Sequence, residues 1–102
     1  MKLKLTAYAR LQIRTIFLYH KHAASISVAR KIKRNILDNI KYLEQFPESG
    51  QREEYMDRYG HDFRRIISGN YKIIYRIEEQ VVLITDVFDG RQDPTKAVTG
   101  NL

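Results

Sequence analysis

The sequence contains no cysteine, so neither a disulfide bond nor a thiolate metal site is available to this chain. It has no apolar run that approaches the roughly 20 residues needed to span a bilayer, and its first residues lack the hydrophobic core of a signal peptide. Its three histidines form no ligand cluster with nearby carboxylates, and no glycine-rich phosphate loop occurs. We therefore expect no membrane association, no metal and no cofactor, with the cytoplasm as the default location.

What the sequence does contain is typical of one globular domain over residues 1–102. The hydrophobic share of 43% argues against disorder, and a chain of this length can bury a single core. We find no internal repeat, no low-complexity tract and no second domain. The net charge is +6, with 10 Lys/Arg against two Asp/Glu between Met1 and Phe46 and an acidic excess after Ile77. Such an uneven positive field favours nucleic acid or an acidic protein segment as the partner.

The strongest strand signal lies between Phe63 and Pro94. Short segments rich in Ile, Val, Tyr and Phe are separated there by breaks of about three residues, a pattern that predicts three antiparallel strands joined by hairpins. Gly69 and Asn70 suit the positive backbone angles of a tight turn. Along the middle strand, successive side chains point to opposite faces. One face carries Tyr71, Ile73, Tyr75 and Ile77, and the other carries Lys72, Ile74 and Arg76.

The first of these two faces can bury against a helical layer, whereas the face with Lys72 and Arg76 is half cationic. A half-cationic face is not the composition of a dry core. It is either an ordinary solvated sheet face or a binding face for an anionic or acidic partner, and the pattern alone leaves both interpretations open.

The first half of the chain predicts one strand and two helices. Residues 2–6 alternate polar and apolar side chains, as a short strand does. From Ala7 to about His22 the apolar residues recur at helical spacing, and Thr6 is a suitable N-cap. A second helix is predicted from Ser25 or Ser27 to Phe46, where Pro47 ends it. Because only a few residues separate the two helices, they should form an antiparallel hairpin.

The remaining segments are the polar stretch 47–62 and the end of the chain. The polar stretch is predicted to be a long connection, part of which three residues could pin to the surface: Tyr55, Met56 and Tyr59. Residues 89–94 have turn chemistry, and residues 95–102 are expected to form a weakly structured tail. The order of elements predicts an α+β fold, β-α-α-β-β-β, with an N-terminal helical hairpin packed on one face of a four-stranded, mainly antiparallel sheet. The opposite face would be open, with Lys72 and Arg76 emerging from it.

Four groups of residues carry a resemblance to a known family. They are Ala9, Ile13, Ile16 and Tyr19 in the first helix, Leu43, Pro47 and Gly50 at the end of the second, Arg65 with Gly69 to Arg76, and the closing Val87 to Pro94. Taken in order, this series resembles the RelE/ParE superfamily of type II toxin–antitoxin toxins over nearly the whole chain. The resemblance implies a growth-inhibiting toxin held inactive by a cognate antitoxin that wraps an amphipathic segment over it. An acidic segment would complement the charge of the helical hairpin.

This superfamily acts on two kinds of target. RelE-like members cut mRNA in the ribosome, whereas ParE-like members poison DNA gyrase and have no known hydrolytic chemistry. RNA cleavage through the 2′-hydroxyl needs a base, an acid and cations that stabilise the phosphorane. The resemblance places Arg65, Lys72 and Arg91 near basic active-site positions of RelE-like enzymes, with Lys72 replacing a more usual Arg. The candidates for target binding are Arg65, Lys72, Arg76 and Arg91.

The acid and base that a nuclease needs are poorly supplied. RelE-like enzymes commonly carry a Tyr, or a His-Tyr pair, at or after the end of the last strand, and here no Tyr or His follows Tyr75. His61 could approach the site, although a lone loop histidine is more often exposed, and Asp86 and Asp89 more simply pair with arginines. The ending Gly90 to Pro94 is also closer to ParE-like sequences. The ParE-like interpretation is therefore favoured, with a RelE-like ribosome-dependent mRNA endoribonuclease as the alternative.

A third interpretation is a small basic nucleic-acid-binding module. Such a module needs aromatic side chains that are exposed among the cations for stacking. Tyr71 and Tyr75 are predicted to lie on the face opposite Lys72 and Arg76, so this interleaving is absent.

Two histidines lie at the predicted turn between the helices, His20 and His22, and we expect them to cap this turn or to be solvated there.

Overall fold

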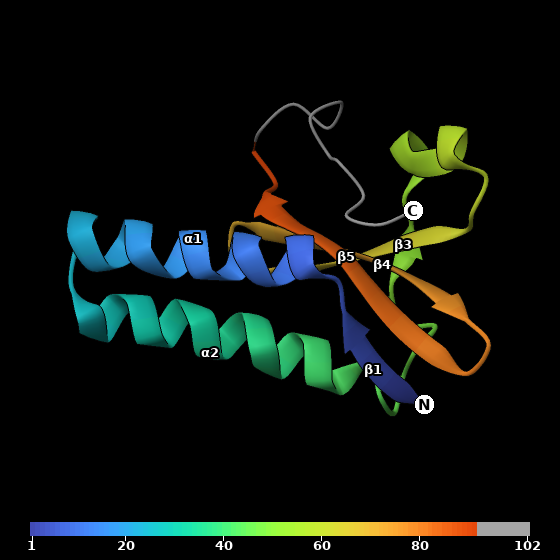
Figure 1. The fold of residues 1–102 in the computed structure, drawn as a ribbon, viewed down its shortest axis with the longest axis horizontal. Coiled ribbons are helices and arrows are strands. Elements are labelled where there is room, and N and C mark those ends of the chain that lie inside the picture. The colour runs from blue at the N-terminus through green and yellow to red at the C-terminus, as the bar shows by residue number, and fades with distance from the viewer. Residues whose placement is uncertain (92–102) are drawn as a thin grey trace.

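The computed structural model describes residues 1–91, and its elements follow one another in the order β1-α1-α2-β2-η1-β3-β4-β5 (Figure 1). The first three are the strand β1 (Lys2–Leu5) and the helices α1 (Ala7–Ala23) and α2 (Ile26–Tyr42). The others are β2 (Gln51–Arg52), the 3₁₀ helix η1 (Glu54–Tyr59), β3 (Phe63–Ser68), β4 (Tyr71–Glu78) and β5 (Val81–Asp89). Residues 92–94 of the predicted closing turn and the predicted tail at 95–102 lie outside the described residues.

The strands form one mixed sheet in the order β1-β5-β4-β3-β2. Strand β1 lies at one edge, parallel to β5, and the other neighbouring pairs are antiparallel. The α+β class is confirmed, as is the helical hairpin, whose two helices lie side by side in Figure 1. The sheet has five strands rather than the predicted four, because Gln51 and Arg52 pair with the backbone of β3.

Both helices begin where a side-chain oxygen caps the first turn. Thr6 accepts a hydrogen bond from the backbone N–H of Ala9 at 3.0 Å, as predicted, and Ser25 does the same for α2. Helix α2 ends at Tyr42, four residues before the predicted end at Phe46. The backbone there tightens to bonds between residues three apart, such as Leu43 N–H to the Ile40 carbonyl. Within residues 1–91, neither helix has the length and apolar composition needed to cross a membrane.

The main core lies between the helical hairpin and one face of the sheet. Its fully buried members include Ile36, Leu43, Ile73, Tyr75 and Ile84. They come from the apolar stripe of α2 and its C-cap residue, and from alternate positions of β4 and β5. The prediction that Tyr71, Ile73, Tyr75 and Ile77 face the helices is confirmed, since all four belong to this cluster or pack against it.

The second face of the sheet is not open, so that part of the prediction is wrong. The connection after Pro47 folds as β2 and η1, and this brings Met56 against Phe63 and Ile74 in a second, smaller core. Tyr59 and Phe88 pack around it. The suggestion that Tyr55, Met56 and Tyr59 pin the connection to the surface is confirmed for Met56 and Tyr59, whereas Tyr55 is 57% exposed.

The Tyr75 hydroxyl anchors the start of this connection. It donates a hydrogen bond to the Pro47 carbonyl at 2.8 Å and accepts one from the Gly50 N–H at 2.9 Å. Arg64 donates to the Gly50 carbonyl at 3.0 Å. Burial raises the pKa of Tyr75, so its phenol stays protonated and able to donate. These bonds fix the position at which β2 enters the sheet.

The two hairpin turns only partly follow the predicted turn chemistry. Gly69 has a φ of +59°, as expected, but Asn70 does not need a positive angle. In the β4–β5 turn, Glu79 and Gln80 adopt φ angles of +48° and +67°. Nothing in their residue types would suggest this conformation, which glycine and asparagine prefer.

Candidate functional site

Two of the predicted site cations meet on the second face of the sheet. Lys72 Nζ lies 3.2 Å from Glu53 Oε2, and Arg65 Nη1 lies 3.8 Å from the same oxygen. We call Glu53, Arg65 and Lys72 the ion cluster. Glu53 is only 3% exposed because it lies between β2 and η1, where the connection turns over the sheet. Glu53 Oε2 accepts no hydrogen bond from the described residues, so the two cations are what compensates its buried charge.

Lys72 and Arg76 point to the predicted face, but neither emerges freely into solvent. The side chain of Lys72 is 15% exposed, with its ammonium about 6 Å from the rings of Tyr55 and Phe88. Arg76 is 7% exposed, lies over the ring of Phe63 and pairs with Glu78 at 3.0 Å. Coverage of this face by η1 explains the difference from the prediction.

Arg91 is separated from the ion cluster. Its guanidinium holds both carboxylate oxygens of Asp89, at 2.7 and 3.0 Å, beside α1 rather than beside η1. Hydrogen bonds from Arg91 lower the pKa of Asp89 to about 2, so the pair stays ionised at neutral pH. The suggestion that Asp89 pairs with an arginine is confirmed. The structure thus brings Arg65 and Lys72 together, and each of the four predicted cations contacts a carboxylate of this same chain.

His61 is exposed, as expected for a lone loop histidine, whereas His20 departs from its expected role. His20 was predicted to cap or solvate the helix turn, but its Nε2 lies 2.7 Å from the hydroxyl of Tyr71, which is 51 residues away in the chain. His61 lies against the ring of Phe63, among residues such as Arg52 and Asp62 and outside the ion cluster. Within residues 1–91, no group of three or more His, Asp or Glu side chains is placed to hold a metal ion.

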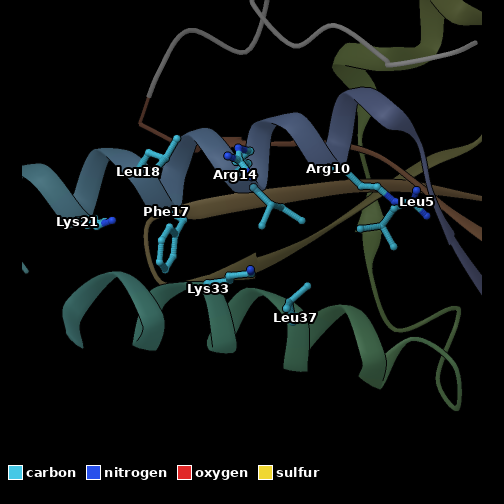
Figure 2. Close-up of a pocket in the computed structure, with 9 residues that line it drawn as sticks. Leu5, Arg10, Arg14, Phe17, Leu18, Lys21, Lys33 and Leu37 are labelled. Atoms are coloured by element: carbon cyan, nitrogen blue, oxygen red, sulfur yellow. The ribbon is translucent and has the colours of Figure 1, made fainter. Parts of the chain in front are cut away.

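Two grooves flank helix α1, and they differ in charge. The first, which we call the cationic groove, is a cavity of about 490 Å³ between α1 and α2. Figure 2 shows Phe17 of α1 pointing toward α2, where Lys33 and Leu37 lie. Its charged lining residues are all basic: Arg10, Arg14, Lys21 and Lys33. Among the described residues, none of these four forms an ion pair.

The second groove lies between α1 and the end of β5, with a volume of about 660 Å³. We call it the tyrosine groove because Tyr8, Tyr19 and Tyr71 line it. Neither groove was predicted from the sequence, although the alternation of aromatic and basic positions around α1 indicates part of this arrangement.

Glu53 is the member of the ion cluster that was not predicted from the sequence, and both cations of the cluster pair with it. We predict that Glu53→Gln lowers the free energy of unfolding by roughly 1–3 kcal/mol, because two partly buried cations lose their common counter-ion. Urea titration measures this loss. Glu54→Gln, at an exposed neighbour that forms no ion pair within residues 1–91, should change stability by less than about 0.5 kcal/mol. Adding Lys72→Met to Glu53→Gln should restore part of the lost free energy of unfolding. Equal losses for Glu53→Gln and Glu54→Gln would contradict the account.

Comparisons with known proteins agree with the sequence resemblance. The chain matches the sequence model of a family described as the ParE toxin of the type II toxin–antitoxin system parDE, over residues 3–94. Its fold is similar to that of a solved structure, the chromosomal ParDE toxin–antitoxin system from P. aeruginosa, with a TM-score of 0.74. The two chains share 18% identity, and the alignment covers 87% of this chain and 95% of the other. No match was found among curated proteins. The family match spans nearly the whole sequence, and the chain therefore belongs to the ParE toxin family of type II toxin–antitoxin systems, in which its partner is an antitoxin.

Proposed function

We propose that this toxin inhibits growth by acting on DNA gyrase, without hydrolytic chemistry of its own, and that an acidic segment of its antitoxin binds the cationic groove. The observation that carries the gyrase proposal is the family match over residues 3–94, to the ParE branch of the superfamily. The uncompensated charge of the cationic groove carries the antitoxin proposal.

The cationic groove suits an amphipathic acidic helix. Its floor and walls include the apolar side chains of Ile13, Phe17 and Leu37, and four basic residues surround them. An apolar stripe on a partner helix would bury against this floor, and acidic residues on either side of the stripe would pair with the cations. Because no carboxylate of the described residues pairs with these cations, a partner's carboxylates would meet no internal carboxylate in competition. Complementary charge would also speed association.

Charge pairing argues against the nuclease alternative. A ribonuclease must present cations to the developing negative charge of the phosphorane. Arg65 and Lys72 share Glu53, and Arg91 is held by Asp89, so each would have to leave an internal carboxylate before meeting a phosphate. Of the four predicted target-binding residues, Arg91 is the best placed to contact a partner, since its side chain is 71% exposed while that of Arg76 is 7% exposed.

The tyrosines of β4 do not form the stacking platform that the nucleic-acid-binding alternative needs. Tyr75 is fully buried, and Tyr71 lies on the helix side, away from Lys72 and Arg76. The cations of the second face are paired with carboxylates. This arrangement gives naked nucleic acid little to bind beyond the basic surface of the helices.

The test compares two reactions with the same purified toxin. We expect cleaved gyrase–DNA complexes to accumulate when the toxin is added to gyrase, ATP and supercoiled plasmid, and we expect ribosome-bound mRNA to stay intact. Prior addition of the antitoxin should suppress complex formation. Cleavage of mRNA at the ribosomal A site without gyrase complexes would overturn the proposal, and Arg65→Ala should then abolish that cleavage without unfolding the protein.

A further inference from the structure

The tyrosine groove lies on the flank of α1 opposite the cationic groove. Each residue of an α-helix is rotated by about 100° from the one before it, so residues two positions apart point to nearly opposite sides of the helix. Phe17 lines the cationic groove and Tyr19 lines the tyrosine groove, so helix α1 separates two distinct surfaces. A partner confined to the first surface would leave the second accessible.

The floor of the tyrosine groove is held in place by contacts between elements. His20 of α1 lies 2.7 Å from the Tyr71 hydroxyl of β4, and Gln12 of α1 accepts a hydrogen bond of 2.7 Å from the Val87 N–H of β5. Burial raises the pKa of Tyr71, so its phenol stays protonated and can donate to the imidazole. A groove fixed in this way needs little rearrangement to receive a partner.

The walls of this groove have the composition of a protein-binding surface. Leu11 is 57% exposed and Tyr19 is 65% exposed, and Tyr8 lies beside them on the same flank. Tyrosine and arginine are over-represented among the residues that dominate binding energy in interfaces. A tyrosine presents a large, amphipathic surface with few rotatable bonds, so little conformational entropy is lost on binding.

Charge distinguishes the partner of this groove from the antitoxin. Apart from His20, the only charged residues of the described chain that line it are Asp89 and Arg91, which neutralise each other. An acidic segment would gain attraction from four unpaired cations on one flank of α1 and almost none on the other. The neutral, aromatic flank instead complements an uncharged segment that presents apolar side chains.

We infer that the tyrosine groove receives an uncharged apolar segment of the toxin's protein target, while the antitoxin binds the opposite flank of α1. The identity of that target as gyrase rests on the proposed function. The groove would then anchor the target through Leu11 and Tyr19, with Arg91 at its margin. The antitoxin would neutralise the toxin by its bulk beside α1 rather than by filling the target's groove.

The test is a Leu11→Ala/Tyr19→Ala toxin, with Ile67→Ala as the matched control. Ile67 is exposed to a similar extent, 56%, but lies on β3 and lines neither groove. We expect the double variant to bind immobilised gyrase roughly 30-fold more weakly, the range of a hot-spot loss. Its affinity for the antitoxin and its melting temperature should match those of wild type, and Ile67→Ala should leave both affinities unchanged.

The other outcomes distinguish a failure of the inference from a failure of the proposed function. If wild type binds gyrase and the double variant binds it equally well, the inference is wrong while the proposed function stands. If wild type does not bind gyrase but the double variant loses growth inhibition, gyrase is the wrong target and the groove's role in target binding stands. A loss of antitoxin affinity, or a smaller oligomer than wild type in sedimentation, would assign the groove to the antitoxin or to a second copy and overturn the inference.

Discussion

Reversing two charges of the cationic groove, with Arg14→Glu and Lys33→Glu together, is expected to weaken antitoxin binding by at least about 100-fold, because like charges brought together across an interface cost several kcal/mol. Both side chains line the groove, and among the described residues neither forms an ion pair, although the Lys33 ammonium lies 5.4 Å from the centre of the Phe17 ring. The double variant removes two attractions and introduces two repulsions toward an acidic segment. Surface plasmon resonance at physiological salt, with the purified antitoxin as ligand, measures the change.

A control of equal net charge separates the local effect from the general field. Lys31→Glu with Arg58→Glu changes the total charge by the same amount, and neither residue lines the groove. This variant should bind the antitoxin less than about threefold more weakly than wild type. The loss should come mainly from slower association, and added salt should reduce the difference from wild type. If the two double variants weakened binding equally, the attraction would come from the net charge alone and the groove would lose its assigned role.

Gly50→Ala is expected to destabilise the fold by about 3 kcal/mol, at the upper end of what overpacking a filled site costs. A Cβ at this position would lie 2.5 Å from the Tyr75 hydroxyl and 2.8 Å from the backbone carbonyl of Arg65. The backbone atom cannot move aside without disturbing the pairing of β2 with β3. The melting temperature should fall by roughly 15 °C for a domain of this size.

Gly60→Ala is the matched control for this prediction. Gly60 has a φ of +76° but no neighbour within 4 Å of the added methyl group, so only backbone strain is introduced. Its cost should be about 1 kcal/mol. Equal losses for the two variants would show that Tyr75 and Arg65 do not restrict the space at Gly50.

The hydrogen bond between the Gly50 N–H and the Tyr75 hydroxyl fixes where β2 begins. Gly50→Ala should therefore also loosen the ion cluster at Glu53.

The elements that the sequence predicts well are those governed by local periodicity. The helical spacing of Ala9, Ile13 and Ile16, the cap at Thr6 and the alternation along β4 all follow from neighbouring residues, and the structure places them as expected. The unpredicted features depend on contacts between distant segments. The 3₁₀ helix η1 has a polar sequence, and its position is decided by the burial of Met56 against Ile74.

The candidate site was predicted less completely than the fold for the same reason. Arg65 and Lys72 were correctly identified as basic residues of the sheet, but their common partner Glu53 lies in a stretch whose acidic composition suggests solvent exposure. The contact of His20 with Tyr71 joins a helix to a strand across 51 positions, and no local pattern reveals it. Whether the predicted cations bind the target stays a proposal.

The most direct test of this account is hydroxyl-radical footprinting of the toxin alone and in complex with its antitoxin. The labelling rate of each side chain reports its exposure, and both grooves are lined by exposed apolar residues. We predict that the antitoxin protects Leu18 and Leu37 of the cationic groove and leaves Leu11 and Tyr19 of the tyrosine groove as reactive as in the free toxin. Unchanged labelling of Leu18 and Leu37, with protection of Leu11 and Tyr19 instead, would contradict the division of α1 into an antitoxin flank and a target flank.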